Sequence, residues 1–241
     1  GWLNEADEPL FPVNAGYTIT SRQAISDLPC VSSIDGFSLE GKQKQMPRKG
    51  SKPRDFIRWC RLTSAPNSPK RNPLLHHTRA VNPRDQGIFP NLQSGENSQR
   101  VLYKDVTMEM VRQYLPEGYR LREFKTVPSR VEGPMWGRQK RMKWKFYDQK
   151  KFGDKMRRIR GDQPSPTIVA HLAKDGYMFV HPDENRTITV REAARFQSFP
   201  DSFDFSAGGQ NSISDQFRQI GNAVSPLFAK AIGKELMKIF D

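Results

Sequence analysis

The pattern of apolar and polar positions predicts two helices near the end of the chain. The first begins with a capping box, in which Thr189 is the N-cap and Glu192 lies three residues later. Apolar positions continue to Phe196, and Pro200 marks the end of this helix. The second helix covers 226–240, where apolar side chains recur at helical spacing. Such an amphipathic helix must pack on another element.

A tight turn is predicted between these two helices. Gly221 permits an unusual backbone conformation or the close approach of another segment, and Asn222 is a common turn residue. Ser225 is placed to cap the following helix, and Pro226 to occupy its first position. The pattern therefore predicts a turn at 219–224 that leads directly into the last helix.

Weaker helical signals occur earlier in the chain. Thr20 and Gln23 form a second capping-box pattern, which predicts a short helix that Pro29 ends. Thr107 is placed to cap another short helix over 107–114, whereas 55–60 is compatible with either a helix or a strand.

The only hairpin pattern of the chain lies in its second half. The segments 164–171 and 177–181 are each typical of a short strand, and Lys-Asp-Gly at 174–176 is a turn signal between them. Together with the helices, this pattern predicts a mixed α/β fold with few strands and much irregular backbone.

Composition narrows the partners of this chain. Its 241 residues suggest one or two domains, and their formal net charge is +13 with a pI near 9.9. A strongly basic protein favours a polyanionic partner, with nucleic acid first and an acidic membrane second. The sequence has no apolar run of spanning length and no signal peptide, so we expect a cytoplasmic protein without a membrane partner.

The positive charge is concentrated between residues 140 and 160. Ten lysines and arginines stand there against Asp148 and Asp154, which gives a local net charge of +8. Cations with interleaved aromatic side chains suit a phosphate backbone, although the aromatic residues themselves are better interpreted as a small core. The predicted DNA-binding residues are Lys140, Arg141, Lys143, Lys145, Lys150, Lys151, Arg157, Arg158 and Arg160.

Cysteine and histidine positions give little support to metal or disulfide chemistry. Cys30 and Cys60 form neither a disulfide framework nor a metal-binding spacing, which is typical of a reducing compartment. His76 and His77 are adjacent, but no further ligand stands at metal spacing from them. The sequence therefore predicts no metal site.

Two runs of the chain resemble the last two conserved motifs of the DNA (cytosine-5) methyltransferases. They are TVREAARFQSFPDSF at 189–203 and QIGNAV at 219–224, in the order and at the spacing of that family. The runs YTITSRQAISDLP at 17–29 and PSPTIVAH at 164–171 also resemble it, and by this resemblance His77 is a structural residue of the recognition domain.

The resemblance implies only the carboxyl-terminal half of the family's architecture. This half has an irregular target-recognition domain with short strands. Its C-terminal helix packs on a Rossmann-like catalytic domain that is absent from this chain. The implied parts are a lead-in at 1–29, the recognition domain at 30–186, a supporting helix and hinge at 187–213, and a cofactor-side turn and helix at 214–241.

The resemblance also implies roles for individual residues. It places Asn222, Ala223 and Val224 against S-adenosylmethionine, largely through backbone atoms and the Asn side chain. The implied structural residues, of which the charged ones are expected to be buried anchors, are Arg191, Glu192, Arg195 and Gly221.

The chemistry of this family requires groups that the sequence lacks. A thiolate adds to C6 of a flipped-out cytosine, an acid acts near N3, and C5 then takes the methyl group. The family carries that thiol in Pro-Cys-Gln and the acid in Glu-Asn-Val, and neither tripeptide occurs here. Cys30 follows Pro29 but precedes Val31, so we do not interpret it as the nucleophile.

We therefore expect the DNA-recognition half of a DNA (cytosine-5) methyltransferase from a bacterial or phage restriction–modification system. Its catalytic half would be a separate subunit or the missing part of the same chain. Two alternatives remain open: a non-catalytic DNA-binding accessory protein, and part of an RNA cytosine methyltransferase. A neighbouring reading frame that carries the catalytic motifs would favour the enzyme.

Overall fold

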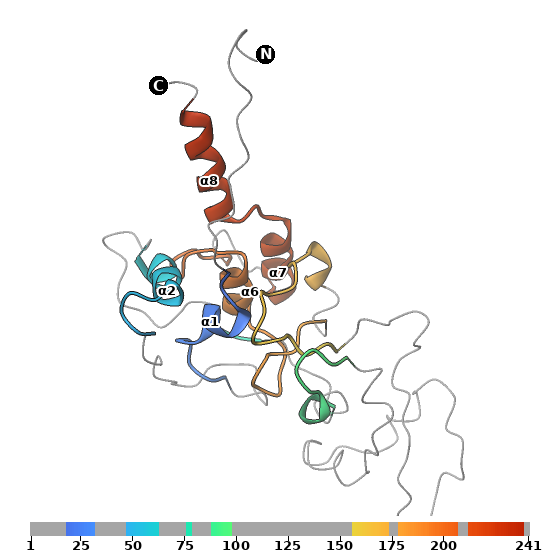
Figure 1. The fold of residues 1–241 in the computed structure, drawn as a ribbon. Helices are drawn as coiled ribbons and strands as arrows, with labels where there is room; N and C mark the ends of the chain where they lie inside the picture. The colour runs from blue at the N-terminus through green and yellow to red at the C-terminus, as the bar shows by residue number, and fades with distance from the viewer. Residues whose placement is uncertain are drawn as a thin grey trace, which may run out of the picture.

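The structure is a computed structural model in which helices dominate the described part of the chain (Figure 1). The structure describes residues 18–31, 47–62, 76–78, 88–97, 156–173, 178–206 and 212–238. The α-helices are α1 (Ser21–Ile25), α2 (Lys52–Leu62), α6 (Val190–Phe196), α7 (Ile213–Asn222) and α8 (Pro226–Met237). The short 3-10 helices are η1 (Phe89–Asn91) and η3 (Ala170–Ala173). None of the described helices is both long and apolar enough to cross a bilayer.

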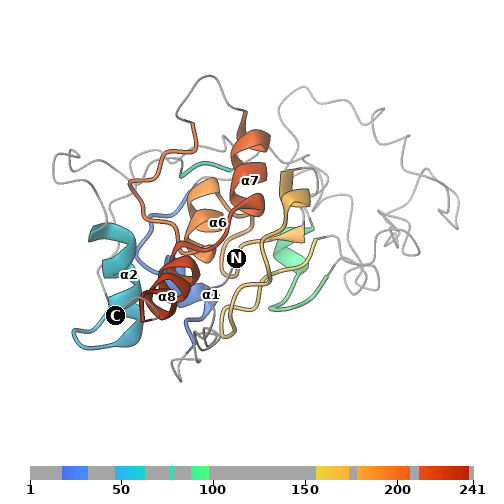
Figure 2. The ribbon, with the colours of Figure 1, turned by 90° about the horizontal axis from the view of Figure 1, so that it is seen from above.

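Helix α6 lies at the centre of these elements (Figure 2). It contacts α1 on one side and α7 on another, and α7 in turn packs closely on η3. Ala193 and Ala194 are fully buried, and their small side chains let the neighbouring helices come close. Phe217 and Ile220 of α7 complete this core together with Leu172 of η3.

Both predicted capping boxes are confirmed. The Thr20 hydroxyl accepts a hydrogen bond from the Gln23 N–H at the start of α1, and the Gln23 side-chain oxygen accepts one from the Thr20 N–H. The Thr189–Glu192 pair does the same at the start of α6. The predicted cap at Ser225 is confirmed as well, with a proline in the first turn of α8. These starts were predictable because a capping box is a local interaction.

The segment 219–222 is not a tight turn, which corrects the prediction from the sequence. It forms the last turn of α7, and the chain leaves the helix at Ala223 in an extended conformation. Ser212 and Asp215 form a capping box ten residues upstream of Asn222 that starts this helix. The helix then continues because it buries Phe217 and Ile220 on one face.

The close approach predicted at Gly221 is present. A Cβ atom on this residue would lie 2.5 Å from the backbone carbonyl of Val169, just before η3. Helix α7 can therefore sit directly on the backbone of the η3 segment, which explains why a glycine stands here.

The two predicted strands are wrong for the described residues. The segment 164–169 is irregular and continues into η3, and β pairing is limited to isolated bridges at Val180. Two prolines in 164–166 cannot donate to a strand ladder. Ile168 and Leu172 then face the core four residues apart, which is a helical rather than a strand spacing. The predicted turn at 174–176 lies outside the described residues.

Two other predictions have different outcomes. The segment 55–60, which fitted either a helix or a strand, belongs to α2. Ile57 and Cys60 are completely buried three residues apart, so the pattern is that of a helix with one face on the core. The helix predicted at 107–114 lies outside the described residues.

Helix α8 extends away from the other described helices (Figure 1). None of its described residues is buried. Phe228 is 49% exposed and Met237 59% exposed, and Val224 just before the helix is 63% exposed. The apolar side of this amphipathic helix is thus not covered by the described part of the chain.

The two glycines of α7 and α8 provide a matched test of this packing. Gly221→Ala should lower the free energy of unfolding by about 1–3 kcal/mol, because the new methyl group meets backbone that cannot yield. Gly233→Ala adds a methyl group with nothing within 4 Å, so it should raise stability by about 0.5–1 kcal/mol. Urea denaturation followed by circular dichroism measures both, and equal effects would contradict the close packing of α7 on η3.

Candidate functional site

A completely buried ion pair holds the start of α6. The Arg186 guanidinium donates two hydrogen bonds to the Glu192 carboxylate, at 2.8 and 2.7 Å. Each side chain of this pair is 1% exposed. Arg186 also donates to Glu184 and to the Thr187 carbonyl. This paired geometry satisfies both charges inside the protein.

His76 is part of the same network. Its Nε2 lies 2.9 Å from the Pro29 carbonyl oxygen, so Nε2 carries the proton of the neutral ring. Its Nδ1 then accepts from the Thr189 hydroxyl at 3.1 Å, while that hydroxyl accepts from the Glu192 N–H. The N-terminal turn of α6 is thereby linked to the residues that follow α1.

The sequence indicated His77 rather than His76 as the structural residue of this pair. The buried ring with two hydrogen bonds is that of His76, which is 5% exposed. The half-buried His77 contributes its backbone carbonyl, which accepts from the Val190 N–H at 3.1 Å. Among the residues that the structure describes, no three His, Cys, Asp or Glu side chains are placed to hold a metal ion.

His181 lies on the other side of Glu192. Its Nδ1 accepts hydrogen bonds from the backbone N–H groups of Asp183 and Glu184, so its Nε2 carries the proton of the neutral ring. This Nε2 lies 3.5 Å from a carboxylate oxygen of Glu192. Burial lowers the pKa of His181 despite the nearby carboxylate. Burial alone would raise the pKa of Glu192, but Arg186 and His181 outweigh it and hold that pKa well below its usual range.

A second buried charge cluster surrounds Arg195 at the other end of α6. Its guanidinium donates two hydrogen bonds to Asp201, at 2.9 and 2.6 Å, and is also paired with Asp27. Asp27 in turn accepts from Arg61 of α2 at 2.7 Å. One carboxylate therefore joins α6, α2 and the end of α1.

Arg191 holds the chain that follows α6. Its guanidinium donates to the carbonyl oxygens of Pro200 and Phe203, at 3.1 and 2.9 Å. Because the side chain is completely buried, its pKa falls to about 10. In the turn that it holds, the ring centroids of Phe203 and Phe199 are 5.0 Å apart. These aromatic rings cover one end of the core. The structure thus places Arg191, Glu192 and Arg195 of α6 inside the protein, each with its own set of partners.

Arg158 does not fit the predicted DNA-binding role. Its side chain is 6% exposed, and its guanidinium donates to the carbonyl oxygens of Phe89 and Leu92 and to those of the 181–184 segment. It also donates to the Asn185 side chain at 2.8 Å. A guanidinium with its donors used inside the protein is not available to a phosphate, so Arg158 is a structural residue.

Arg158 also marks the point where the basic segment returns to the described fold. The Gly95 N–H donates to the Arg158 carbonyl at 3.0 Å, and the Arg158 N–H donates to the Glu96 carbonyl at 2.9 Å. Residues 95–96 and Arg158 therefore lie side by side, and we call this pairing the paired neck.

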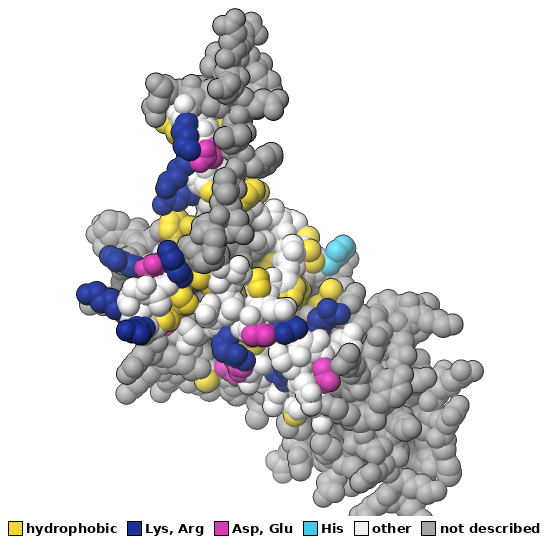
Figure 3. Space-filling view, in the orientation of Figure 1, with side chains coloured by type: hydrophobic (Ala, Val, Ile, Leu, Met, Phe, Trp, Pro, Cys, Tyr) yellow, Lys and Arg dark blue, Asp and Glu magenta, His cyan; other side chains and the backbone are white. Residues whose placement is uncertain are grey.

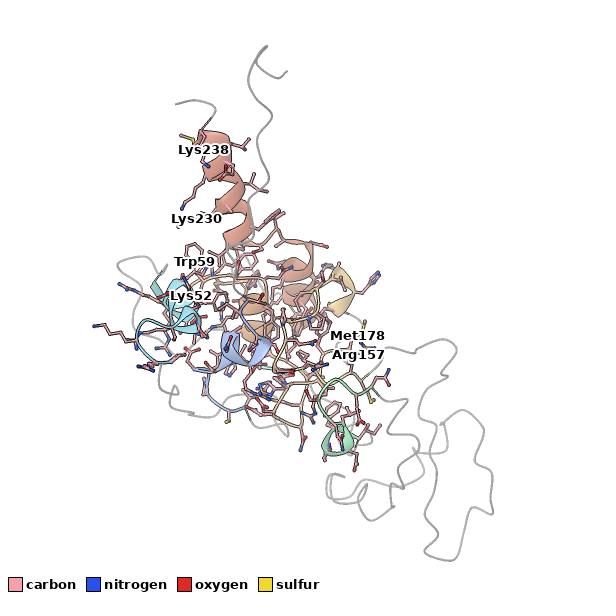
Figure 4. The ribbon with its side chains drawn as sticks, in the orientation of Figure 1. Lys52, Trp59, Arg157, Met178, Lys230 and Lys238 are labelled. Atoms are coloured by element: carbon pink, nitrogen blue, oxygen red, sulfur yellow. The ribbon has the colours of Figure 1, made fainter. Side chains whose placement is uncertain are left out.

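The other predicted cations have different positions. Arg157 and Arg160 are exposed on either side of the buried Arg158 (Figure 4 labels Arg157). Arg160 forms an ion pair with Asp162 at 2.9 Å, and both side chains remain more than half exposed. The predicted DNA-binding residues that lie outside the described part of the chain are Lys140, Arg141, Lys143, Lys145, Lys150 and Lys151.

The predicted cofactor-side residues form an exposed strip between α7 and α8. Asn222 ends α7, Ala223 is extended, and Val224 is largely exposed. Gln197, directly after α6, lies 3.3 Å from the Ile220 carbonyl through its side-chain amide and so ties α6 to the end of α7. An accessible amide beside an apolar side chain suits one wall of a pocket for a ligand with both polar groups and a flat apolar face.

The start of α8 is attached to the same core. Ser198 adopts a left-handed conformation with φ of 61°, and its hydroxyl lies 2.6 Å from that of Ser225, the N-cap of α8. The Leu227 N–H donates to the Ser198 hydroxyl at 3.1 Å. The loop after α6 therefore sets where α8 begins.

Comparison with known proteins shows to which family this architecture belongs. The model of the C-5 cytosine-specific DNA methylase family matches residues 72–238, which include the Arg186–Glu192 pair and all of α6, α7 and α8. The chain belongs to the C-5 cytosine-specific DNA methylase family.

Relatives of this methylase show how much of the family's length the chain represents. It is 32% identical to M.OihORF3336P of Oceanobacillus iheyensis over 91% of the chain and 44% of that relative. It is 52% identical to the type II methyltransferase M.AgeI of Thalassovita gelatinovora over 38% of the chain and 20% of that protein. The chain thus spans less than half the length of these two relatives.

A third relative of this methylase is much shorter. The chain is 40% identical to the type II methyltransferase M.AquIB of Picosynechococcus sp. over 103 residues, which are 38% of the chain and 72% of that protein. M.AquIB is therefore itself shorter than the present chain.

Several residues of the methylase's α6 clusters could not be identified from the sequence. The partners of Arg195 are Asp27 and Asp201, which come from segments far apart in the chain. The signal for Asp27 was weak: it is a charged residue between the apolar Ile25 and Leu28. Nothing in the sequence distinguished the buried Arg158 from its exposed neighbours.

Removing one charge from the Arg186–Glu192 pair should destabilise the methylase strongly. Glu192→Gln keeps the side-chain shape but leaves the buried Arg186 without its main carboxylate, so we expect a loss of about 3–5 kcal/mol in the free energy of unfolding. The control is Lys238→Gln, which breaks an exposed pair with Glu235 and should change stability by less than about 0.5 kcal/mol. Urea denaturation of both variants is the measurement, and a loss for Glu192→Gln as small as the control's would contradict the role of the pair.

The buried histidines and carboxylates predict a fall in stability towards acid. Burial lowers the pKa of His76 and His181 below the ordinary value of 6.5, so the unfolded chain binds protons first and stability should fall as pH drops below about 6.5. The depressed pKa values of Glu192 and Asp27 add a further loss below their ordinary values of 4.5 and 3.8. Urea titrations across this pH range measure the effect, and His171→Gln, at an exposed position, should leave the profile unchanged.

Proposed function

We propose that this chain is the recognition and cofactor-side half of a DNA (cytosine-5) methyltransferase of a type II restriction–modification system. The enzyme would transfer a methyl group from S-adenosylmethionine to C5 of cytosine in duplex DNA. One observation carries this proposal: the two motif segments fold together, with α6 held by buried ion pairs and the 222–224 strip left exposed beside it.

The catalytic thiolate of the proposed enzyme would come from outside this sequence. The 241 residues contain neither Pro-Cys-Gln nor Glu-Asn-Val. Cys60 is completely buried, and burial raises the pKa of its thiol to about 12, so it stays protonated at neutral pH. Cys30 is exposed, but it lacks the Gln that would follow the family's nucleophile.

In one arrangement a separate subunit supplies the catalytic half, and the short relative M.AquIB supports this arrangement. A curated type II methyltransferase that is shorter than the present chain carries the same region, at 40% identity over 103 residues. The uncovered apolar side of α8 is the surface expected to pack on the Rossmann-like catalytic domain. In this arrangement 1–29 leads in from that domain, 30–186 recognises the target, 187–213 supports it, and 214–241 returns to the catalytic domain.

The chain's own residues would position the reaction rather than carry it out. S-adenosylmethionine supplies an electrophilic methyl group when bound. The Asn222 amide and the backbone of Ala223 and Val224 would form one wall of its pocket. The exposed Arg157 near the paired neck at Arg158 would lie against a DNA phosphate, while the target base is turned out of the duplex towards the catalytic half.

Reassembly tests the proposed division of labour. The purified chain alone should transfer no methyl group to duplex DNA, and adding a catalytic half that contains Pro-Cys-Gln should restore transfer. Incorporation of labelled methyl groups from S-adenosylmethionine measures this. Transfer by the chain alone that disappears in Cys30→Ser would overturn the proposal and make Cys30 the nucleophile.

The alternatives predict different outcomes of the same experiment. Tight binding to duplex DNA without methyl transfer by any reassembled pair would favour an accessory DNA-binding protein. Methylation of a structured RNA in preference to duplex DNA would favour an RNA cytosine methyltransferase.

Asn222 tests the proposed cofactor wall. Asn222→Ala should weaken S-adenosylmethionine binding by the reassembled enzyme about two- to tenfold, which corresponds to the loss of one hydrogen bond. Stability and DNA affinity should stay nearly unchanged, because Asn222 is exposed. Calorimetry measures the cofactor affinity, with Arg218→Ala on the exposed side of α7 as the control. An unchanged affinity in Asn222→Ala would show that this strip is only a connection between helices.

A further inference from the structure

Helix α2 and the residues before it carry an unusual density of positive charge. Arg48, Lys49 and Arg58 are exposed, and none of them forms an ion pair with a carboxylate of the described residues. Lys52 is exposed on the same helix. The carboxylate of α2 in this stretch is that of Asp55, so the local balance is strongly positive.

Several other exposed cations of the described residues form an ion pair with a carboxylate of the chain. Arg22 pairs with Asp183 at 2.7 Å. Arg218 pairs with Asp215 at 2.5 Å, and Lys238 pairs with Glu235 at 2.7 Å. In these places an internal carboxylate already neutralises the charge. Arg48, Lys49 and Arg58 have no such carboxylate among the described residues, which leaves their charge available to an external anion.

Helix α8 continues this positive surface. Lys230 and Lys234 are four residues apart, so they lie along one side of the helix. The Lys230 ammonium lies 4.9 Å from the centre of the Trp59 ring in α2. This contact joins the cations of the two helices on one side of the molecule. Figure 3 shows Lys and Arg side chains gathered on this side. In Figure 4 the labels of Lys52, Trp59 and Lys230 lie one above the other, from α2 towards α8.

The contact between α2 and α8 is held in place by Ser198, in the loop after α6. The Trp59 ring nitrogen donates to the Ser198 carbonyl at 2.9 Å, so the ring under Lys230 has a defined position. Ser198 also contacts Ser225 and the Leu227 N–H at the start of α8. The same loop therefore positions α2 and α8, the two parts of the positive surface, relative to each other. Cations that contact the regularly spaced phosphates of DNA need such fixed positions.

We propose that the exposed cations of α2 and α8 form a second binding surface for the phosphate backbone of duplex DNA. This α2–α8 surface consists of Arg48, Lys49, Lys52, Arg58, Lys230 and Lys234. It is separate from the basic segment at 140–160, and it rests on the proposed function. Its contacts hold DNA beside the target without reading sequence, because phosphates are the same at every base pair.

Salt dependence distinguishes this surface from a merely solvated face. Each cation that neutralises a phosphate releases counterions, so the slope of log affinity against log salt falls by about one per contact removed. The test variant combines Arg48→Ala, Lys49→Ala and Arg58→Ala in the full chain. We expect its slope to fall by about three, with the same loss of affinity on two duplexes of unrelated sequence. Fluorescence anisotropy with labelled duplexes at several salt concentrations is the measurement.

The chain offers a control with the same change in net charge. The control variant combines Arg22→Ala, Arg218→Ala and Lys238→Ala, whose cations are exposed but paired with the chain's own carboxylates. Its slope should stay close to that of the unaltered chain. A separate Lys230→Gln variant should lower the slope by about one, which tests α8 independently of α2. Should the triple variant fail to fold, the single variants Arg48→Gln and Arg58→Gln should each lower the salt slope by about one.

The outcomes separate this proposal from the proposed function. An unchanged slope in the test variant, or an equal fall in the control, overturns the α2–α8 surface. So does loss of association with the catalytic half at an unchanged slope, since the surface would then contact protein. Binding of the α2–α8 surface to anionic vesicles, together with an unchanged DNA slope in the test variant, would show that this surface contacts lipid instead of DNA. In each of these cases, methyl transfer by the reassembled enzyme still decides the proposed function by itself.

Discussion

The described fold depends on buried guanidinium groups. Arg158, Arg186, Arg191 and Arg195 are all buried. Arg158 and Arg195 donate to groups 69 and 168 residues away, whereas Arg186 and Arg191 donate to groups 6 and 12 residues away. Between the described segments, β pairing is limited to isolated bridges, so no sheet satisfies these carbonyls. A planar group with five donors can satisfy several of them at once. The cost of burying each charge is offset only while its partners stay in place, which makes the arrangement specific.

Helix α6 gathers three of these interactions on a single short element. Glu192 faces Arg186 and the two buried histidines, Arg195 faces α1 and α2, and Arg191 faces the turn that follows the helix. Two residues just after α6, Gln197 and Ser198, then position the end of α7 and the start of α8. The charged residues of this motif thus act on the proposed cofactor strip through packing, without contacting it.

The structure divides the chain's net charge of +13 into groups with different physical meaning. Some arginines are buried and hold the fold together, as Arg158 does. Others, such as Arg22, are exposed but neutralised by a neighbouring carboxylate. A third group, which includes Arg48, Lys49 and Arg58, has no such partner among the described residues, and it is the group able to attract a polyanion. Composition adds these groups together, although only the last contributes directly to binding.

The sequence alone determined the features that depend on neighbouring residues. The capping boxes at Thr20 and Thr189 and the cap at Ser225 were predictable because each joins residues three positions apart. The family motifs were also visible there. Tertiary structure decided the rest: one partner of Arg195 is Asp27, 168 residues away, and Arg158 is buried although Arg157 and Arg160 are exposed. Likewise, 219–222 is helical because Phe217 and Ile220 are buried, and 164–171 forms no strand because Ile168 and Leu172 pack on the same core. Such contacts depend on which distant segments meet in the fold, and a local sequence pattern does not predict which segments these are.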